Sequence, residues 1–196
     1  MNHTYDETIQ EMLTQAEALK FEGRCQDSIK LLEQVIIMEP LCSEAFEEIG
    51  DNYLTNRETA KAKKALDHAL KINPQSFNAH YLMGFLYSLD ESWRDSVTEL
   101  QKADKLSPNH PEILRCLGWA FYNANRKSQG ISVLERSRNL NPFDPNILCD
   151  LGVCYMNSEQ YAEASKCFEQ ALKIDPNSSQ AKECLQMLKM LDGGLE

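Results

Sequence analysis

The spacing of its prolines constrains this chain more than any other feature. A proline cannot continue a helix, and it pushes the residue before it out of the helical conformation. Five of the seven prolines fall 34 residues apart, at Pro40, Pro74, Pro108, Pro142 and Pro176. A proline at a fixed phase marks the same helix end each time, so the chain is predicted to be a tandem array of 34-residue units. Pro111 and Pro145 are also 34 apart, and we expect them at the first position of a helix, where proline is tolerated.

Small residues keep the same period inside apolar helical patterns. They are Ala16, Gly50, Gly84, Gly118 and Gly152. Glycine inside a helix costs about 1 kcal/mol relative to alanine, so its repeated use needs a structural reason. We expect a second helix to pass too closely at these points for a side chain to fit.

Two amphipathic runs occur in each unit. Residues 112–124 and 127–140 both place apolar residues three and four apart, with a short polar break between them. Each unit is therefore predicted to be a helical hairpin, and no run alternates with period two for long enough to predict a strand. Because one hairpin cannot bury its apolar face alone, neighbouring hairpins are expected to stack. The fold class is predicted to be all-α.

The residues at fixed positions of these units resemble the tetratricopeptide repeat family. In the last unit they are Leu148, Leu151, Gly152, Tyr155, Ala164, Phe168, Ala171 and Pro176. The resemblance implies a right-handed α-solenoid of antiparallel helix pairs, with repeats at 9–42, 43–76, 77–110, 111–144 and 145–178. We expect 179–191 to form a capping helix and 192–196 a tail whose last residues, Leu195 and Glu196, are consistent with a vector-derived scar. The whole chain, 1–196, is predicted to be a single domain.

Composition narrows the functional classes. No apolar stretch approaches the roughly 20 residues that a membrane-spanning helix needs, and residues 1–6 do not resemble a secretory signal. The seven cysteines form an odd count without a paired framework, which favours a reducing compartment and a cytoplasmic protein. We expect Cys154, Cys167 and Cys184 to be small core residues, and we expect neither a metal site nor a cofactor.

The net charge of −10 is unevenly distributed. Residues 1–60 hold 13 acidic and 4 basic side chains, a balance of −9, whereas residues 61–196 hold 17 and 16, a balance of −1. Such a field disfavours nucleic acid and favours a partner with a basic segment. The alternative is that these carboxylates only keep one end of the array soluble.

Helical geometry locates the surface on which function is expected. If positions 4, 7, 8 and 11 of each repeat pack inward, positions 2, 5, 9 and 12 form a second stripe on the first helix. In tetratricopeptide proteins this stripe lines the concave groove. Here it predicts an acidic groove at Glu44, Glu47 and Asp51, and an exposed aromatic groove of Tyr81, Phe85, Trp119 and Tyr122 flanked by Asn78, Arg115 and Asn146.

Exposed aromatic rings beside an arginine are typical of binding hot spots, and an asparagine can both donate to and accept from a peptide backbone. The alternative is that the rings pack against each other within a tightly curved stack, or against the amino-terminal tail. Some family members hold the carboxyl-terminal tails of chaperones with a Lys-Asn-Asn-Lys-Arg clamp. Leu13 and Glu17 stand at the first two clamp positions, so binding of such tails is not expected.

Enzymatic activity is not expected. The four histidines, His3, His68, His80 and His110, are scattered along the sequence, which does not point to a catalytic site. The chain is predicted to be a non-enzymatic scaffold that binds a peptide or helix of a partner protein in its groove. Two alternatives remain open at this point: a homo-oligomer in which the groove receives the amino-terminal helix or cap of another copy, and a small acidic chaperone of a bacterial secretion system.

Overall fold

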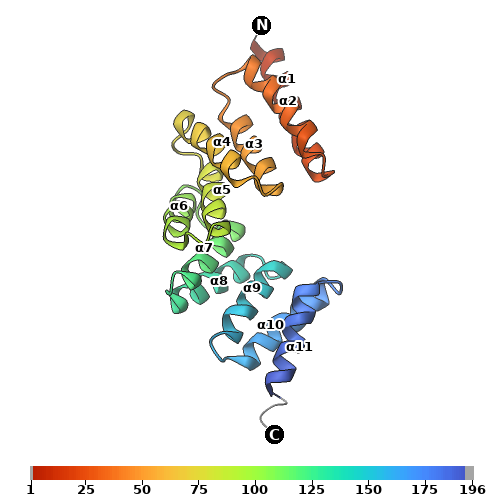
Figure 1. Cartoon of the computed structure of the whole chain (residues 1–196), viewed down its shortest axis with the longest axis vertical. Coiled ribbons are helices and arrows are strands. Elements are labelled where there is room, and N and C mark those ends of the chain that lie inside the picture. The colour runs from red at the N-terminus through yellow and green to blue at the C-terminus, as the bar shows by residue number, and fades with distance from the viewer. Residues whose placement is uncertain (1, 193–196) are drawn as a thin grey trace. The chain divides into compact units, whose positions relative to one another are not determined.

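The structure is a computed structural model in which residues 2–192 are described. Within this range there are eleven α-helices and no strands, as the repeat pattern predicts (Figure 1). The expected tail at 193–196 and the side chains of His3 and Leu191 lie outside what the structure describes. The all-α prediction is confirmed.

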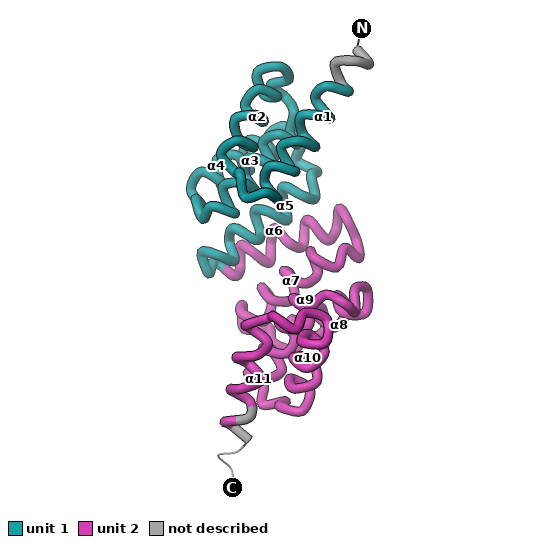
Figure 2. The backbone as a smooth tube through the Cα atoms, turned by 90° about the vertical axis from the view of Figure 1, so that its right-hand side faces the viewer, with its two compact units in different colours: residues 1–92 teal, residues 93–196 magenta. Residues whose placement is uncertain are grey.

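The chain divides into two compact units, residues 1–92 and 93–196 (Figure 2). The boundary falls between the two helices of the third predicted repeat. The continuous single domain over 1–196 therefore stays a prediction, and the two units are described separately.

Unit 1 contains five helices. They are α1 (Asn2–Phe21), α2 (Cys25–Met38), α3 (Ser43–Thr55), α4 (Thr59–Ile72) and α5 (Phe77–Leu89). Consecutive helices pair as antiparallel hairpins, α1 with α2 and α3 with α4. One core joins Ala16, Leu32, Val35 and Ile49, and a second joins Leu66 to apolar residues of α3 and α5.

Unit 2 contains six helices. They are α6 (Trp93–Leu106), α7 (Pro111–Asn123), α8 (Lys127–Leu140), α9 (Pro145–Met156), α10 (Tyr161–Ile174) and α11 (Ser179–Asp192). The hairpins are α7 with α8 and α9 with α10, and α11 packs on both α9 and α10. Phe168, Ala171, Cys184 and Leu188 form part of one core, so α11 packs its apolar side against α10.

The periodic prolines mark helix ends as predicted. Each second helix of a repeat ends two residues before its proline, for example α4 at Ile72 before Pro74 and α8 at Leu140 before Pro142. Pro111 opens α7 and Pro145 opens α9.

The turn between the two helices of each repeat contains one residue in the left-handed conformation. It is the fifteenth residue of the repeat every time: Gly23, Arg57, Glu91, Asn125 and Glu159, with φ of 77, 59, 55, 64 and 61°. Only the first is glycine, the residue that adopts this conformation without steric cost. The repeat geometry therefore imposes this backbone conformation on Arg57, Glu91 and Glu159, which do not favour it, while asparagine at position 125 adopts it more readily.

Close helix contact explains the periodic glycines at three of the four positions. A Cβ on Gly50 would lie 2.8 Å from Leu66, and one on Gly152 would lie 2.6 Å from the Phe168 ring. On Gly118 a Cβ would meet backbone as well, at 2.9 Å from the Gly130 carbonyl oxygen. The second helix of the repeat thus passes too closely for a side chain, as expected.

Candidate protein-binding surface

The surface predicted from the sequence consists of one stripe on the first helix of each repeat. We call these residues the inner stripe and treat each unit by itself. In unit 1 it comprises Gln10, Leu13, Glu17 and Lys20 of α1, Glu44, Glu47, Asp51 and Leu54 of α3, and Asn78, Tyr81, Phe85 and Ser88 of α5. In unit 2 it comprises Glu112, Arg115, Trp119 and Tyr122 of α7, and Asn146, Cys149, Val153 and Met156 of α9.

Polar contacts join the inner stripe of unit 1 from helix to helix. Lys20 Nζ of α1 lies 2.5 Å from Asp51 Oδ2 and 2.9 Å from Glu48 Oε2 on α3. Asn78 Nδ2 of α5 donates a hydrogen bond to Glu47 Oε2 at 2.9 Å. The structure therefore brings α1, α3 and α5 together along the predicted stripe.

The acidic part of the stripe is less available than expected. Glu47 is only 6% exposed, and burial raises the pKa of its carboxyl although hydrogen bonds from Ser76 and Asn78 oppose this shift. Asp51 is paired with Lys20, so neither carboxylate is a free anionic contact. The expectation of three open carboxylates is wrong for Glu47, because the start of α5 covers it; Glu44 is exposed.

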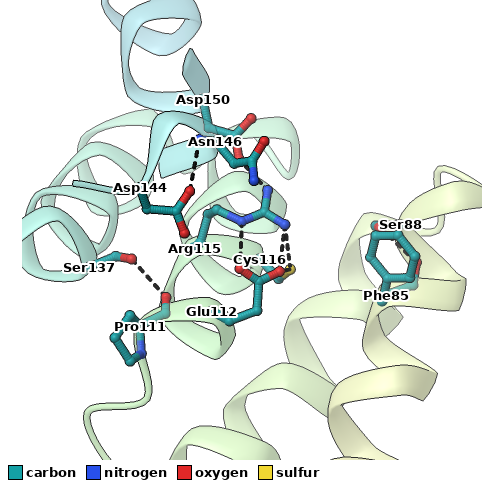
Figure 3. A network of polar contacts seen from close by, with 10 residues as sticks. All are labelled: Phe85, Ser88, Pro111, Glu112, Arg115, Cys116, Ser137, Asp144, Asn146 and Asp150. Carbon is teal, nitrogen blue, oxygen red and sulfur yellow. Dashed lines mark hydrogen bonds and ion pairs between the residues drawn. The ribbon is translucent and has the colours of Figure 1, made fainter. Parts of the chain in front are cut away.

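A hollow of about 540 Å³ opens on the inner stripe of unit 1. Leu54, Phe85 and Leu89 line it together with the polar Asp51 and Arg57. Tyr81 and Phe85 are half-buried against the core formed by α3, α4 and α5. The Phe85 carbonyl accepts a hydrogen bond from Ser88 Oγ at 2.6 Å (Figure 3). This hollow offers an apolar floor with one carboxylate and one guanidinium at its edge.

An ion-pair network occupies the polar end of the inner stripe in unit 2 (Figure 3). Arg115 Nε and Nη2 donate to the two oxygens of Glu112 at 2.9 and 2.6 Å, and Nη1 donates to Asp150 Oδ2 at 2.6 Å. The Arg115 and Asp150 side chains are only 19% and 15% exposed. Arg115 thereby links α7 to α9, and all three of its guanidinium nitrogens donate to carboxylates.

Burial and ion pairing shift the pKa values of Arg115 and Asp150 in opposite directions. Burial by itself would lower the pKa of Arg115, but hydrogen bonds and charge interactions with its acidic neighbours outweigh it, so this pKa is raised. Burial also raises the pKa of Asp150 despite the attraction of Arg115. The network is therefore a structural tie between two repeats in addition to being part of the predicted surface.

The aromatic part of the stripe in unit 2 is more buried than predicted. Tyr122 is only 6% exposed and packs with Leu134, Leu151, Cys154 and Cys167, which come from α8, α9 and α10. Its hydroxyl lies 3.1 Å from Ser158 Oγ. The expectation that Tyr122 faces solvent is wrong, because three helices converge on position 12 of this repeat.

Trp119 is half-buried at the edge of the same cluster, so part of the indole remains accessible. Asn146 is exposed, and its backbone N–H donates to the N-cap carboxylate of Asp144 at 2.8 Å. Val153 and Met156 are half-buried on the neighbouring helix. An apolar row therefore runs from α7 to α9 beside the Arg115 network.

Two methionines that the sequence reasoning missed extend this row onto α11. Met187 and Met190 occupy positions 9 and 12 counted from Ser179, and they are 47% and 67% exposed. They were missed because the repeat resemblance stops at residue 178. Carrying the 34-residue phase one helix further would have found them.

The remaining reactive side chains have structural surroundings. His80 is buried with Nε2 3.1 Å from the Pro74 carbonyl oxygen, and His68 stacks on Phe46. All seven cysteines are unpaired and buried, and burial raises the pKa of Cys116 and Cys154 to about 12. No group of three or more potential ligands gathers at a metal-binding distance within residues 2–192.

None of the described helices is long and apolar enough to cross a bilayer.

Comparison with known proteins identifies tetratricopeptide repeats in this chain. Two family models, each described as Tetratricopeptide repeat, match residues 13–77 and 145–178. Anaphase-promoting complex subunit 3 of Schizosaccharomyces pombe is 24% identical over 106 residues, which are 54% of this chain and 16% of that protein. The chain thus spans about a sixth of that relative.

Solved structures are similar over most of the chain. The Cut9–Hcn1 hetero-tetramer of the APC/C matches with a TM-score of 0.84 and 15% identity, over 88% of this chain and 35% of that one. YrrB, described as a TPR protein with an unusual peptide-binding site, matches with a TM-score of 0.67 and 17% identity, over 95% of this chain and all of that one. At these identities the likeness concerns the fold.

Proposed function

Because the chain belongs to the tetratricopeptide repeat family, we propose that it is a non-enzymatic scaffold that binds a segment of a partner protein along its inner stripes. The fold supports a protein-interaction role in general, and the choice of surface rests on the residues of this chain. YrrB, which has the same fold, is described by its peptide-binding site, so such a fold can hold a peptide.

The observation that carries this proposal is the incompletely buried apolar row of unit 2. Trp119, Val153 and Met156 are half-buried, and Met187 and Met190 are more exposed still. Large side chains in a contiguous row that the fold does not cover favour contact with a partner. Methionine is flexible and polarisable, which suits a row that adapts to apolar residues of a bound helix or extended segment.

Unit 1 would add a second anchor point. The hollow beside Phe85 and Leu54 has room for one apolar side chain, with Arg57 at its edge for polar contacts. A basic segment of the partner would meet Glu17 and Glu44, which are exposed, rather than the buried Glu47. The partner class we propose is therefore a protein segment with apolar anchors and a basic end.

The reactive groups do not favour catalysis. The buried thiols have raised pKa values, which disfavours the nucleophilic thiolate. Seven unpaired cysteines also suit a reducing compartment such as the cytoplasm.

A comparative capture experiment tests this function. Wild-type protein and the Phe85→Ala, Trp119→Ala double variant are used as baits in a native lysate, followed by quantitative mass spectrometry. Phe21→Ala is the matched control, because Phe21 is 80% exposed and lies outside the inner stripe. We expect at least one protein to be retained by wild type and by the control but lost from the double variant.

Direct titration then separates binding from folding. A peptide from the captured protein should bind wild type and the control equally, and the double variant at least tenfold more weakly, with unchanged helicity by circular dichroism. Equal binding to all three proteins would remove the inner stripe from the proposal.

A further inference from the structure

Two positions of the repeat lie on its outer edge, where the second helix ends. Position 29 is occupied by Ile37, Lys71, Lys105, Asn139 and Lys173, and position 33 by Leu41, Gln75, Asn109, Phe143 and Asn177. Polar residues predominate at both positions, so the fold does not require apolar side chains there.

Three apolar residues break this rule, and all three are strongly exposed. Ile37, Leu41 and Phe143 are 80%, 71% and 76% exposed. Position 30 behaves differently, because it is apolar in all five repeats and so belongs to the repeat itself. An exposed apolar residue where equivalent repeats carry lysine or an amide suggests a contact made outside the chain.

Phe143 lies in a basic pocket of unit 2. The pocket, of about 580 Å³, has Pro142 and Ile174 among its apolar walls, and Arg138 and Lys173 supply its charges. No carboxylate lines it. Lys173 makes no ion pair within the described part of the chain, whereas Arg138 pairs with Glu135 at 2.8 Å.

The nearest carboxylates in the sequence have other roles. Asp144 accepts a hydrogen bond from the Asn146 backbone N–H, and Asp175 accepts one from the Asn177 backbone N–H. They stabilise the turns that lead into α9 and α11. These two carboxylates and Glu169 keep their negative charge but do not line the pocket, whereas both charged side chains that line it, Arg138 and Lys173, are cations.

Ile37 and Leu41 lie in surroundings of the opposite sign in unit 1. Residues 31–56 contain no lysine or arginine, and they contain six carboxylates, Glu33, Glu39, Glu44, Glu47, Glu48 and Asp51. Glu33 and Glu44 are exposed and Glu39 is half-buried, and a Glu39 oxygen accepts from the Leu41 backbone N–H at 3.4 Å. We call the residues Glu33, Ile37, Glu39 and Leu41 the acidic edge, and Pro142, Phe143, Lys173 and Ile174 the basic edge.

We propose that the acidic edge of one copy of this chain docks on the basic edge of a second copy. Apolar side chains meet at the centre of this contact and opposite charges surround them, which is the usual arrangement of a specific interface. The two edges differ, so the contact is heterologous, and each pair leaves one free edge of each kind. Association is then head-to-tail, and it uses residues outside the inner stripes.

Residues found at the equivalent positions of other repeats provide substitutions that the fold accommodates. Phe143→Asn places at position 33 the residue that the third and fifth repeats have there, Asn109 and Asn177. Ile37→Asn with Leu41→Asn likewise uses residues found at these positions in other repeats. Both variants should keep the wild-type helicity, because the replaced side chains are 71–80% exposed.

Light scattering and sedimentation measure the outcome. Wild-type protein should show a mass that rises with concentration above the 22.4 kDa of one chain, while each variant alone stays at one chain. Mixing the two variants should restore a 1:1 dimer and nothing larger, because each still carries one intact edge. A symmetric contact would not give this result.

A second experiment reverses the charge of one of two exposed lysines of unit 2. Lys173→Glu and Lys182→Glu change the net charge equally, and both lysines are exposed, but only Lys173 lines the pocket. Lys173→Glu should weaken association about fivefold and Lys182→Glu should not.

Three results would overturn the inference. They are a wild-type mass of one chain at every concentration, Phe143→Asn protein that associates like wild type, and absence of the dimer on mixing. The Phe85→Ala, Trp119→Ala variant should associate normally. If it does not, association uses the inner stripes and the edges have no part in it.

Discussion

Replacing Gly118 by alanine tests whether helix contact within a repeat is as close as the structure indicates. The new Cβ would lie 2.7 Å from Leu134 Cγ, 2.9 Å from the Gly130 carbonyl oxygen and 3.0 Å from the Leu134 backbone nitrogen. Ordinary contact begins near 3.4 Å. The new Cβ and the Gly130 carbonyl oxygen must therefore separate by about 0.5 Å. Because this oxygen belongs to the backbone of α8, the helix itself must move away from α7.

The expected magnitude follows from two opposing terms. Alanine is favoured over glycine inside a helix by about 1 kcal/mol, and overpacking costs about 1–3 kcal/mol. Because backbone rather than a flexible side chain is displaced, the cost belongs near the upper end, which leaves a net loss of about 2 kcal/mol. For a chain of this length such a loss lowers the Tm by about 4–8 °C.

Gly50→Ala is the matched control. At this position a Cβ meets only the Leu66 side chain, at 2.8 Å, and the nearest backbone atom is 3.6 Å away. Its net effect should stay within about 1 kcal/mol of zero. Urea and thermal unfolding followed by circular dichroism measure both variants; a Gly118→Ala protein as stable as wild type would refute the close approach of α7 and α8.

Four further outcomes are expected. Arg115→Met removes the cation that pairs with the mostly buried Asp150 carboxylate, so it should cost about 3 kcal/mol of unfolding free energy in urea titrations. Burial raises the pKa of Glu47, so the stability linked to its protonation is present at low pH and is lost as pH rises through the raised pKa. Glu47→Gln should therefore stabilise the protein at pH 7. This gain should shrink toward pH 4 when unfolding curves of the two proteins are compared. Cys116, with its pKa raised to about 12, should resist thiol reagents at pH 8 until the protein is unfolded, as measured by mass spectrometry. Glu159→Gly should stabilise by about 0.5 kcal/mol in thermal unfolding, since glycine removes left-handed strain at some cost in chain entropy.

Most helix boundaries could be predicted because they depend on local chemistry that recurs at a fixed period. Proline cannot continue a helix, so Pro74 and Pro142 located the ends of α4 and α8 to within two residues. The left-handed turns could not be predicted in the same way, because Arg57, Glu91 and Glu159 are not residue types that signal them.

The candidate site was only partly predictable, because exposure depends on several helices at once. The stripe positions follow from helical spacing, but the burial of Tyr122 depends on α8, α9 and α10 together. Glu47 is covered by residues that lie about 30 positions later in the chain, around Asn78. Whether either side chain can reach a ligand is therefore decided by contacts between repeats, which periodicity within one helix does not report.

Because the turn of every repeat has a left-handed residue at the same position, a whole repeat can be removed or added at that position. Asn125 and Glu159 hold nearly the same backbone conformation, with φ of 64 and 61°, and they are 34 residues apart. Deleting residues 126–159 would join Asn125 directly to Gln160 with the backbone already turned in the required direction. The deletion removes α8 and α9 and leaves α7 to pair with α10, so the array becomes one repeat shorter without a new loop. A gene encoding this fold can therefore lose or gain binding surface in whole-repeat steps.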